Sequence, residues 1–175
     1  RTRKPKDLTA KKNHKFAAVI SARNESAVIG DLSHSIKVQN YPSELIDVFV
    51  IADNCTDDTA RVAREAGAIV FPRSNDKEVG KGYALDYGFQ CIRERYADKG
   101  YEAYFVFDAD NVLDVNYFRE MNKTFDNGAK APTSYRNSKN SDTKWKYVGN
   151  AAWFLRERKF LNQPCLPVHH LCAFS

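Results

Sequence analysis

The alternation of short apolar runs with amphipathic helical patterns is the feature that most constrains the fold of this chain of 175 residues. Four apolar runs are rich in β-branched and aromatic residues and are predicted to be strands, at residues 16–21, 45–52, 68–71 and 101–107. A helical pattern follows each of them, at residues 28–36, 56–66, 83–96 and 115–125. Strands that alternate with helices favour a parallel sheet, so we predict an α/β fold with a doubly wound, mostly parallel sheet and helices on both faces.

Local signals predict where these helices begin and end. Thr56, followed by two aspartates, is a good helix start, because side-chain oxygens and negative charge both suit a helix N-terminus. Gly67 is a plausible stop for the same helix, and Asp114 is a candidate cap for the helix at 115–125. Farther along, we predict a possible strand at 128–133 and an amphipathic helix at 145–160.

Polar residues follow three of the predicted strands. Glu25 follows the first strand, Asp53 follows the second, and Asp108 and Asp110 follow the fourth. The carboxyl ends of parallel strands meet at one edge of a sheet, where ligands bind in such folds. Two acids one residue apart repel each other unless a divalent cation or a shared proton lies between them. The simpler alternative is a solvated strand end whose acids only cap the next helix.

The sequence excludes the common phosphate-binding loops. No Gly-x-Gly-x-x-Gly motif follows the first strand, and the segment 80–82 (Gly-Lys-Gly) lacks the remainder of a P-loop. A cleft lined by acids is instead suited to Mg²⁺ or Mn²⁺, which take carboxylate oxygens and commonly bridge to substrate phosphates. Lys81 and Arg73 are candidates to neutralise the remaining phosphate charge, and Asp53 is a candidate acceptor for a base or a sugar hydroxyl. A nucleotide diphosphate that carries a leaving group meets all of these demands.

Four motifs in order, at residues 19–25, 51–60, 80–85 and 107–110, resemble those of the inverting glycosyltransferase family 2, which has the GT-A nucleotide-sugar fold. The resemblance covers roughly residues 15–160. Segments 136–140 and 153–155 further resemble the membrane-associated members that make cell wall or polysaccharide. The resemblance implies transfer of a sugar from a nucleotide-diphospho-sugar, with a UDP-sugar as the donor it favours, to a saccharide or lipid-linked acceptor.

The resemblance also implies a role for individual residues. It assigns eight residues to the donor site: Ala22, Arg23, Glu25, Asp53, Lys81, Asp108, Ala109 and Asp110. The first three would line the nucleoside pocket, and Asp53 would accept a hydrogen bond from the uracil ring nitrogen. Lys81 would lie near the ribose or the phosphates. Asp108 would lie by the ribose and the metal, and Asp110 would ligate the Mn²⁺ or Mg²⁺ that binds the diphosphate.

The second half of the sequence departs from the family pattern. Family members carry an acidic motif there, whose carboxylate acts as the general base, but Glu157 is the only carboxylate after Trp145 and it matches no such motif. The small, Gly-rich segment expected beyond residue 161 is also missing. The general base is therefore unknown. We expect a donor-binding half that is cut short and that binds the donor without turning it over. Its expected parts are a basic leader at 1–14, a nucleotide-sugar-binding domain at 15–160 and an irregular tail at 161–175.

The net charge of +5 is concentrated at the start of the chain. Residues 1–15 contain seven lysines and arginines and one aspartate, so the rest of the chain is close to neutral. Because these basic residues are not interleaved with aromatic ones, nucleic acid is not an expected partner. A basic arm suits an anionic membrane surface on the cytoplasmic side of the cell membrane, or else it is a solubilising tail. No apolar stretch is long enough to cross a bilayer, so this fragment is expected to be soluble.

Two other functions remain as alternatives, whereas a zinc site near the end of the chain is not favoured. The segment 105–113 also resembles the nucleophile motif of haloacid-dehalogenase-type phosphatases, with Asp108 as nucleophile and Asp110 as general acid. That motif belongs on the first strand of its fold, whereas three strands precede it here. A degenerate, non-catalytic binding domain is the second alternative. Two cysteines and two histidines between residues 165 and 172 fit no standard zinc spacing.

Overall fold

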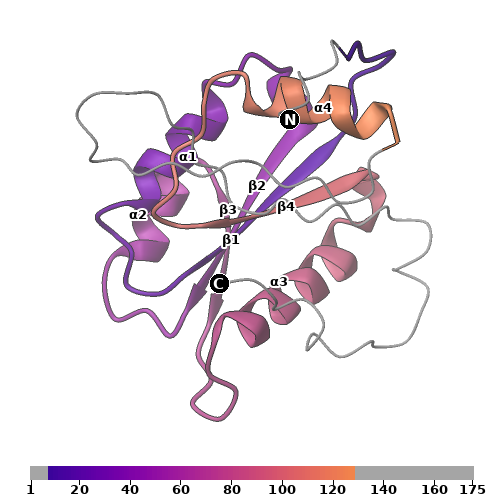
Figure 1. Ribbon diagram of the computed structural model, residues 1–175. Helices are drawn as coiled ribbons and strands as arrows, with labels where there is room; N and C mark the ends of the chain where they lie inside the picture. Colours follow the sequence, from indigo (N-terminus) through magenta and orange to yellow (C-terminus); the bar gives the residue numbers. More distant parts are fainter. Residues whose placement is uncertain (1–7, 129–175) are drawn as a thin grey trace, which may run out of the picture.

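The computed structural model describes residues 8–128. Within these residues, the chain forms a four-stranded sheet in the order β3-β2-β1-β4, and every strand pair is parallel (Figure 1). The strands are β1 (Phe16–Ala22), β2 (Ile46–Asp53), β3 (Ile69–Arg73) and β4 (Ala103–Asp108). The helices are α1 (Ile29–Lys37), α2 (Thr59–Glu65), α3 (Lys81–Arg95) and α4 (Tyr117–Asp126), with 3₁₀ turns at Ser43–Leu45 and Ala97–Lys99. The predicted parallel α/β fold is confirmed.

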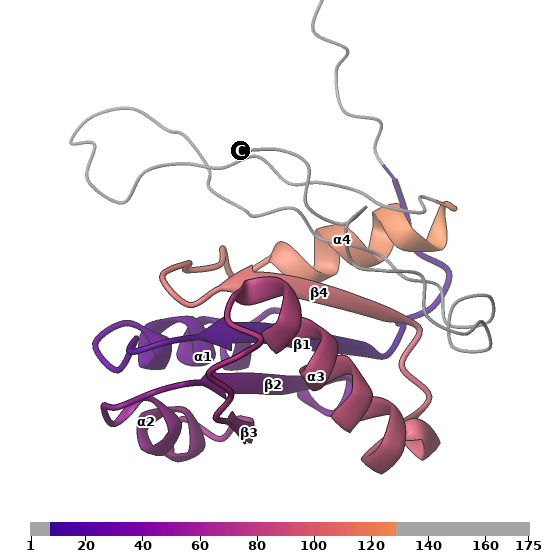
Figure 2. The same cartoon turned by 90° about the horizontal axis from the view of Figure 1, so that it is seen from below.

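Helices cover both faces of the sheet (Figures 1 and 2). One core cluster joins Phe16, Ala18 and Ile20 of β1 to residues of α1, α2 and α4. The other joins Ala17 and Val19 of the same strand to α3. Successive side chains of a strand point to opposite faces, so a strand buried on both faces must be apolar throughout. This explains why the first strand appears as an unbroken apolar run in the sequence.

Three of the predicted helix starts, those of α2, α3 and α4, differ from the structure by two or three residues. Helix α2 begins at Thr59 rather than at Thr56, because the backbone amide and hydroxyl of Thr56 bind the side chain of Asn24 instead. Helix α3 begins at Lys81, so this residue lies in the first helical turn rather than in a loop. The stop at Gly67 is confirmed, since this glycine has a φ of +79° and its amide donates to the carbonyl of Arg64.

The loop before α4 uses its predicted cap in a different way. Asn116, not Asp114, is the N-cap of the helix. The carboxylate of Asp114 accepts a hydrogen bond from the amide of Asn116 at 2.9 Å, and its carbonyl accepts one from the amide of Tyr117. Asp114 therefore organises the turn that leads into α4, because its side chain competes for a local backbone amide.

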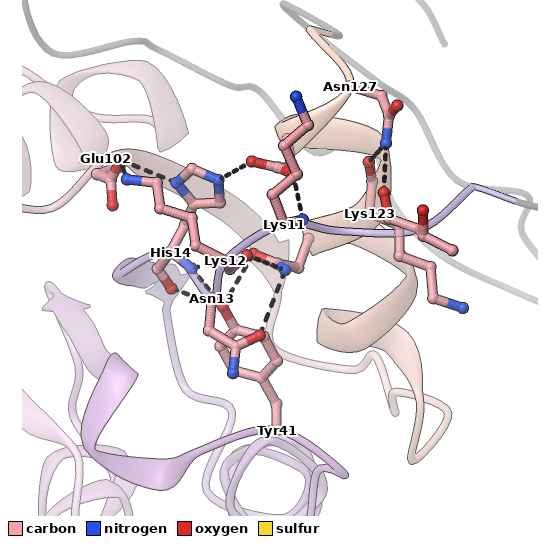
Figure 3. Close-up of polar contacts among 11 residues, drawn as sticks. Lys11, Lys12, Asn13, His14, Tyr41, Glu102, Lys123 and Asn127 are labelled. Atoms are coloured by element: carbon pink, nitrogen blue, oxygen red, sulfur yellow. Dashed lines mark hydrogen bonds and ion pairs between the residues drawn. The ribbon is translucent and has the colours of Figure 1, made fainter.

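The described part of the basic leader packs against the domain (Figure 3). The ring of His14 is buried between two carboxylates, with Nδ1 2.8 Å from Glu102 and Nε2 2.9 Å from Asp126. The backbone amide of His14 donates to the hydroxyl of Tyr41 at 2.7 Å, and burial raises the pKa of that hydroxyl. The segment is thus tied to both the start of β4 and the end of α4.

Several predictions fall on residues that the structure does not describe. These are the start of the basic leader (1–7), most of the possible strand at 128–133, the helix at 145–160, and the tail at 161–175 with its cysteines and histidines. Among residues 8–128, no helix has the length and apolar character needed to cross a membrane.

Candidate donor-binding cleft

A cleft of about 360 Å³ lies at the carboxyl edge of the sheet, where β1, β2 and β4 end. It is lined by Ser21, Arg23, Glu25, Asp53, Gly80, Lys81, Asp108, Ala109 and Asp110. The cleft therefore brings together seven of the eight residues predicted from the sequence. Parallel pairing explains the convergence, because Ser21 is in register with Asp108 on one side of β1 and the end of β2 lies on the other.

Ala22 is the predicted residue that does not line the cleft. Its side chain is 1% exposed and belongs to the core cluster beneath the sheet edge. The reason is the alternation of side chains along β1, which places Ala22 on the same face as Ile20. Its carbonyl accepts a hydrogen bond from the Sγ of Cys55 at 3.4 Å.

Asp53 is held by a buried ion pair at the floor of the cleft. Nη1 of Arg73 lies 2.6 Å from Oδ1 of Asp53, and the two side chains are only 6% and 5% exposed. The other terminal nitrogen of Arg73 donates to the carbonyl of Glu78 at 2.8 Å. Strand pairing creates this contact, because Asp53 and Arg73 are register partners on β2 and β3. The arginine is therefore committed to Asp53 and to the following loop, and it does not line the cleft.

Lys81 and Asp108 form a second ion pair across the cleft. Unlike Arg73, Lys81 is about half exposed, with 49% of its side chain accessible. It is the first residue of α3, and Gly80 precedes it with a φ of +131°, a conformation that side chains disfavour. This glycine turns the chain so that Lys81 points toward the end of β4.

A tight turn presents the two aspartates after β4. The backbone amide and the side-chain amide of Asn111 both donate to the carbonyl of Asp108, at 3.1 and 2.9 Å. Ala109 is buried between the aspartates, whereas Asp110 is exposed. Asn111 thus fixes the turn that separates the two carboxylates.

Two asparagines that sequence reasoning missed hold the loops of the cleft edge together. Asn24 follows β1 and Asn54 follows β2, and both have positive φ values, 54° and 48°. Asn24 accepts from the amide of Thr56 at 2.8 Å, and Asn54 exchanges two hydrogen bonds with the backbone of Asn75. The signal was present in the sequence, since asparagine tolerates this conformation better than most side chains and each one lies within two residues of a strand end.

The carboxylates of the cleft suit a metal ion that is also coordinated by a substrate better than one coordinated by protein side chains alone. Among residues 8–128, no group of three or more His, Cys, Asp or Glu side chains is gathered closely enough to hold a metal ion. Asp108 and Asp110 supply hard oxygen donors in an open cleft. This donor set suits Mg²⁺ or Mn²⁺, which are usually held by one or two carboxylates and completed by substrate phosphates and water.

A parallel α/β domain with an acid-lined cleft at its carboxyl edge has the architecture of the GT-A nucleotide-sugar transferases, and comparison with solved structures supports this class. The chain is similar to residues 1–349 of TarS from S. aureus, with a TM-score of 0.61 and 15% identity over 75% of this chain and 38% of that one. It is also similar to the mannosyltransferase PcManGT from Pyrobaculum calidifontis, with a TM-score of 0.60 and 19% identity over 77% of this chain and 40% of that one. At these identities the likeness concerns the fold alone.

The sequence comparison then gives the family. The model for "Glycosyltransferase like family 2" matches residues 14–162, so the chain belongs to that family. It is 47% identical over 79 residues to the 4,4'-diaponeurosporenoate glycosyltransferase of Staphylococcus aureus strain N315, and 49% identical over 72 residues to that of strain USA300. These matches cover 45% and 41% of this chain, but only 20% and 18% of the relatives, so the aligned part spans about a fifth of their length.

Proposed function

We propose that this chain contributes the donor-binding part of an inverting glycosyltransferase that uses a nucleotide-diphospho-sugar, preferentially a UDP-sugar. The observation that carries the proposal is the convergence of Glu25, Asp53, Asp108 and Asp110 in one cleft at the carboxyl ends of β1, β2 and β4. Two of the structural neighbours were solved with related ligands, TarS with UDP-GlcNAc and PcManGT with GDP-Man and Mn²⁺, which supports a nucleotide-sugar donor.

The acidic and basic residues of the cleft have proposed roles. Asp53, fixed by its buried contact with Arg73, accepts a hydrogen bond from the base, while Arg23 and Glu25 line the nucleoside pocket. Asp108 lies by the ribose, and Asp108 and Asp110 together would hold Mn²⁺ or Mg²⁺. When bound, such a metal supplies Lewis-acid stabilisation of the leaving nucleotide diphosphate.

Lys81 provides a positive charge that can move from a carboxylate to a phosphate. Its partner in the structure is Asp108, and its exposed side chain lies at the mouth of the cleft. The N-terminus of α3 adds backbone N–H groups and a positive dipole end at the same place, which also favour an anion. We propose that Lys81 binds the diphosphate when the donor is present.

The acceptor side of the reaction is proposed only as a class, a hydroxyl of a saccharide or of a lipid-linked molecule in cell-wall or polysaccharide synthesis. The staphylococcal relatives are named for 4,4'-diaponeurosporenoate, but the chain matches only about a fifth of their length, so that compound is not transferred to it. We also propose that the basic residues 1–15 contact an anionic membrane surface on the cytoplasmic side.

The phosphatase alternative has lost its support. The chain belongs to a glycosyltransferase family, and Asp108 shares its cleft with Glu25 and Asp53, which a phosphatase motif leaves unexplained. The alternative that remains is a scaffold whose cleft binds no nucleotide.

Calorimetric titration of the full 175-residue chain with UDP, in the presence and absence of MnCl₂, tests the proposal. We expect manganese-dependent binding by the wild type and a loss of at least about tenfold in affinity in Asp110→Ala, because a metal ligand is removed. Asp98→Ala is the matched control, since Asp98 is an exposed acid outside the cleft. If the wild type binds no UDP with Mn²⁺, the donor-site proposal fails and the scaffold alternative is correct.

A further inference from the structure

The loop that carries Arg23 and Glu25 is held by hydrogen bonds from its backbone amides to side chains at the start of α2. The amide of Glu25 donates to Oγ1 of Thr59 at 2.8 Å, and the amide of Ser26 donates to Oδ2 of Asp57 at 3.1 Å. Two successive amides of the cleft loop are therefore bound to side chains at the start of α2, more than thirty residues farther along the chain.

A single carboxylate organises this contact. Oδ1 of Asp57 accepts hydrogen bonds from the amide and the hydroxyl of Thr59, at 3.0 and 2.5 Å. A threonine hydroxyl has only one proton, so donation to Asp57 leaves the lone pairs of Thr59 for the amide of Glu25. The hydrogen bonds form a directed chain, from the amide of Glu25 through the buried hydroxyl of Thr59 to Asp57.

The ionised form of Asp57 is favoured by these contacts. Hydrogen bonds from the side chain of Thr59 and from Ser26 hold the pKa of Asp57 well below its usual range. The carboxylate is exposed and does not line the cleft, so no ligand contact of its own explains the arrangement. Its neighbour Asp58 behaves differently, since it pairs with Arg61 on the surface of α2.

We propose that Asp57, acting through Thr59, is a positioning residue for the donor site: it sets the placement of the segment with Arg23 and Glu25, and thereby the affinity for the nucleotide, from outside the cleft. This inference rests on the proposed function, since it takes the cleft to be the nucleoside site. It also gives a physical reason for the Thr-Asp-x-Thr pattern at residues 56–59, because Thr56 binds Asn24 while Asp57 and Thr59 bind the next two residues.

A purely electrostatic effect of Asp57 on helix α2 makes a different prediction. Both Asp57 and Asp58 precede α2 and favour its N-terminus electrostatically, so such an effect would make their substitutions equivalent. The hydrogen bond from the amide of Thr59 to Asp57 is specific to Asp57, and Thr59→Val keeps it while removing the contact with Glu25. Positioning requires instead that Asp57→Ala weaken nucleotide binding while Asp58→Ala does not. Asp58→Ala is therefore the matched control, with the same charge change one residue away.

The test measures UDP affinity with Mn²⁺ by calorimetry on the full chain, together with amide hydrogen exchange of Glu25 and Ser26. We expect Asp57→Ala and Thr59→Val each to weaken UDP binding about tenfold, and the double variant to be no weaker than the poorer single one, because one hydrogen-bonded chain is broken in all three. Thr59→Ser keeps the hydroxyl and should bind UDP like the wild type. Exchange at the two amides should accelerate in Asp57→Ala but not in Asp58→Ala.

The outcomes separate this inference from the proposed function. If the wild type binds UDP and both Asp57→Ala and Thr59→Val bind it equally well, the positioning role is refuted while the donor site stands. Equal losses in Asp57→Ala and Asp58→Ala would also refute it, in favour of a purely electrostatic effect on helix α2. If the wild type binds no UDP, the proposed function fails, and the positioning of a nucleotide site fails with it.

Discussion

Replacement of Arg73 by methionine tests the buried pair under the cleft most directly. Methionine keeps much of the apolar stem but removes the charge that faces Asp53 at 2.6 Å. The aspartate is then left in a site where its side chain is 5% exposed, with no compensating cation. The carbonyl of Glu78 also loses its hydrogen bond from the guanidinium.

The expected cost follows from the burial of both partners. Breaking a buried ion pair by removing one partner destabilises a protein by about 3–5 kcal/mol, because the remaining charge stays desolvated. The better packing of methionine offsets a part of this, so we expect about 3 kcal/mol in the free energy of unfolding. In a chain of this size, that corresponds to a fall in Tm of roughly 6–12 °C.

Urea denaturation of the wild type, Arg73→Met, and the double variant Asp53→Asn/Arg73→Met checks this reasoning. The double variant contains no buried charge at the pair, so it should recover at least about half of the lost stability. It should still fail to bind UDP, because the proposed acceptor for the base has been changed. The reasoning is refuted if Arg73→Met unfolds within about 0.5 kcal/mol of the wild type, the range of an ordinary surface substitution.

Two further predictions concern stability away from the cleft. Burial raises the pKa of Glu102, the hydrogen bond from His14 lowers it, and the net effect is a lowering. Glu102 therefore stabilises the fold at pH values above the ordinary glutamate pKa. This stabilisation is lost as the pH falls through the pKa that Glu102 has in the folded protein. Urea midpoints measured from pH 5 to pH 3 should therefore fall less steeply in Glu102→Gln than in the wild type. A Cβ at Gly88 would lie 2.6 Å from the buried side chain of Ile51, so Gly88→Ala should destabilise the chain by about 1 kcal/mol in thermal unfolding. Gly30→Ala is its control, because its Cβ would meet only an ordinary contact at 3.5 Å and should be neutral or stabilising.

The sequence was sufficient to predict the sheet and the edge at which the acids gather. Apolar runs that end in Asp53 and Asp108 give both the strands and the positions where they stop, and parallel pairing then places those positions together. The order β3-β2-β1-β4 was not predicted, because the apolar pattern of a strand buried on both faces carries no information about its neighbours.

The contacts that were missed depend on register and on loop conformation. From the sequence, Arg73 is a plausible phosphate ligand. Only the strand register, which places it opposite Asp53, shows that its side chain is already paired with that aspartate. The start of α2 was placed three residues early, because Thr56 is an equally good N-cap by type and its bond to Asn24 is a tertiary contact. Local propensity does not distinguish a cap from a link between two loops.

The two basic side chains near the cleft acids differ in burial and in pairing, and under the proposed function this difference affects how the cleft accommodates an anionic donor. Arg73 is 6% exposed and is bound at both terminal nitrogens, so moving it would uncover Asp53. Lys81 is 49% exposed and is joined to Asp108 by a flexible four-carbon chain, so exchanging that carboxylate for a phosphate costs little desolvation. Under the proposed function, Lys81 turns toward the diphosphate, and the carboxylate of Asp108 then loses this lysine as a partner, next to Asp110 in the same turn. We therefore predict that a nucleotide diphosphate and a divalent cation favour each other's binding to this chain, because the diphosphate would remove the lysine that competes with the cation for Asp108.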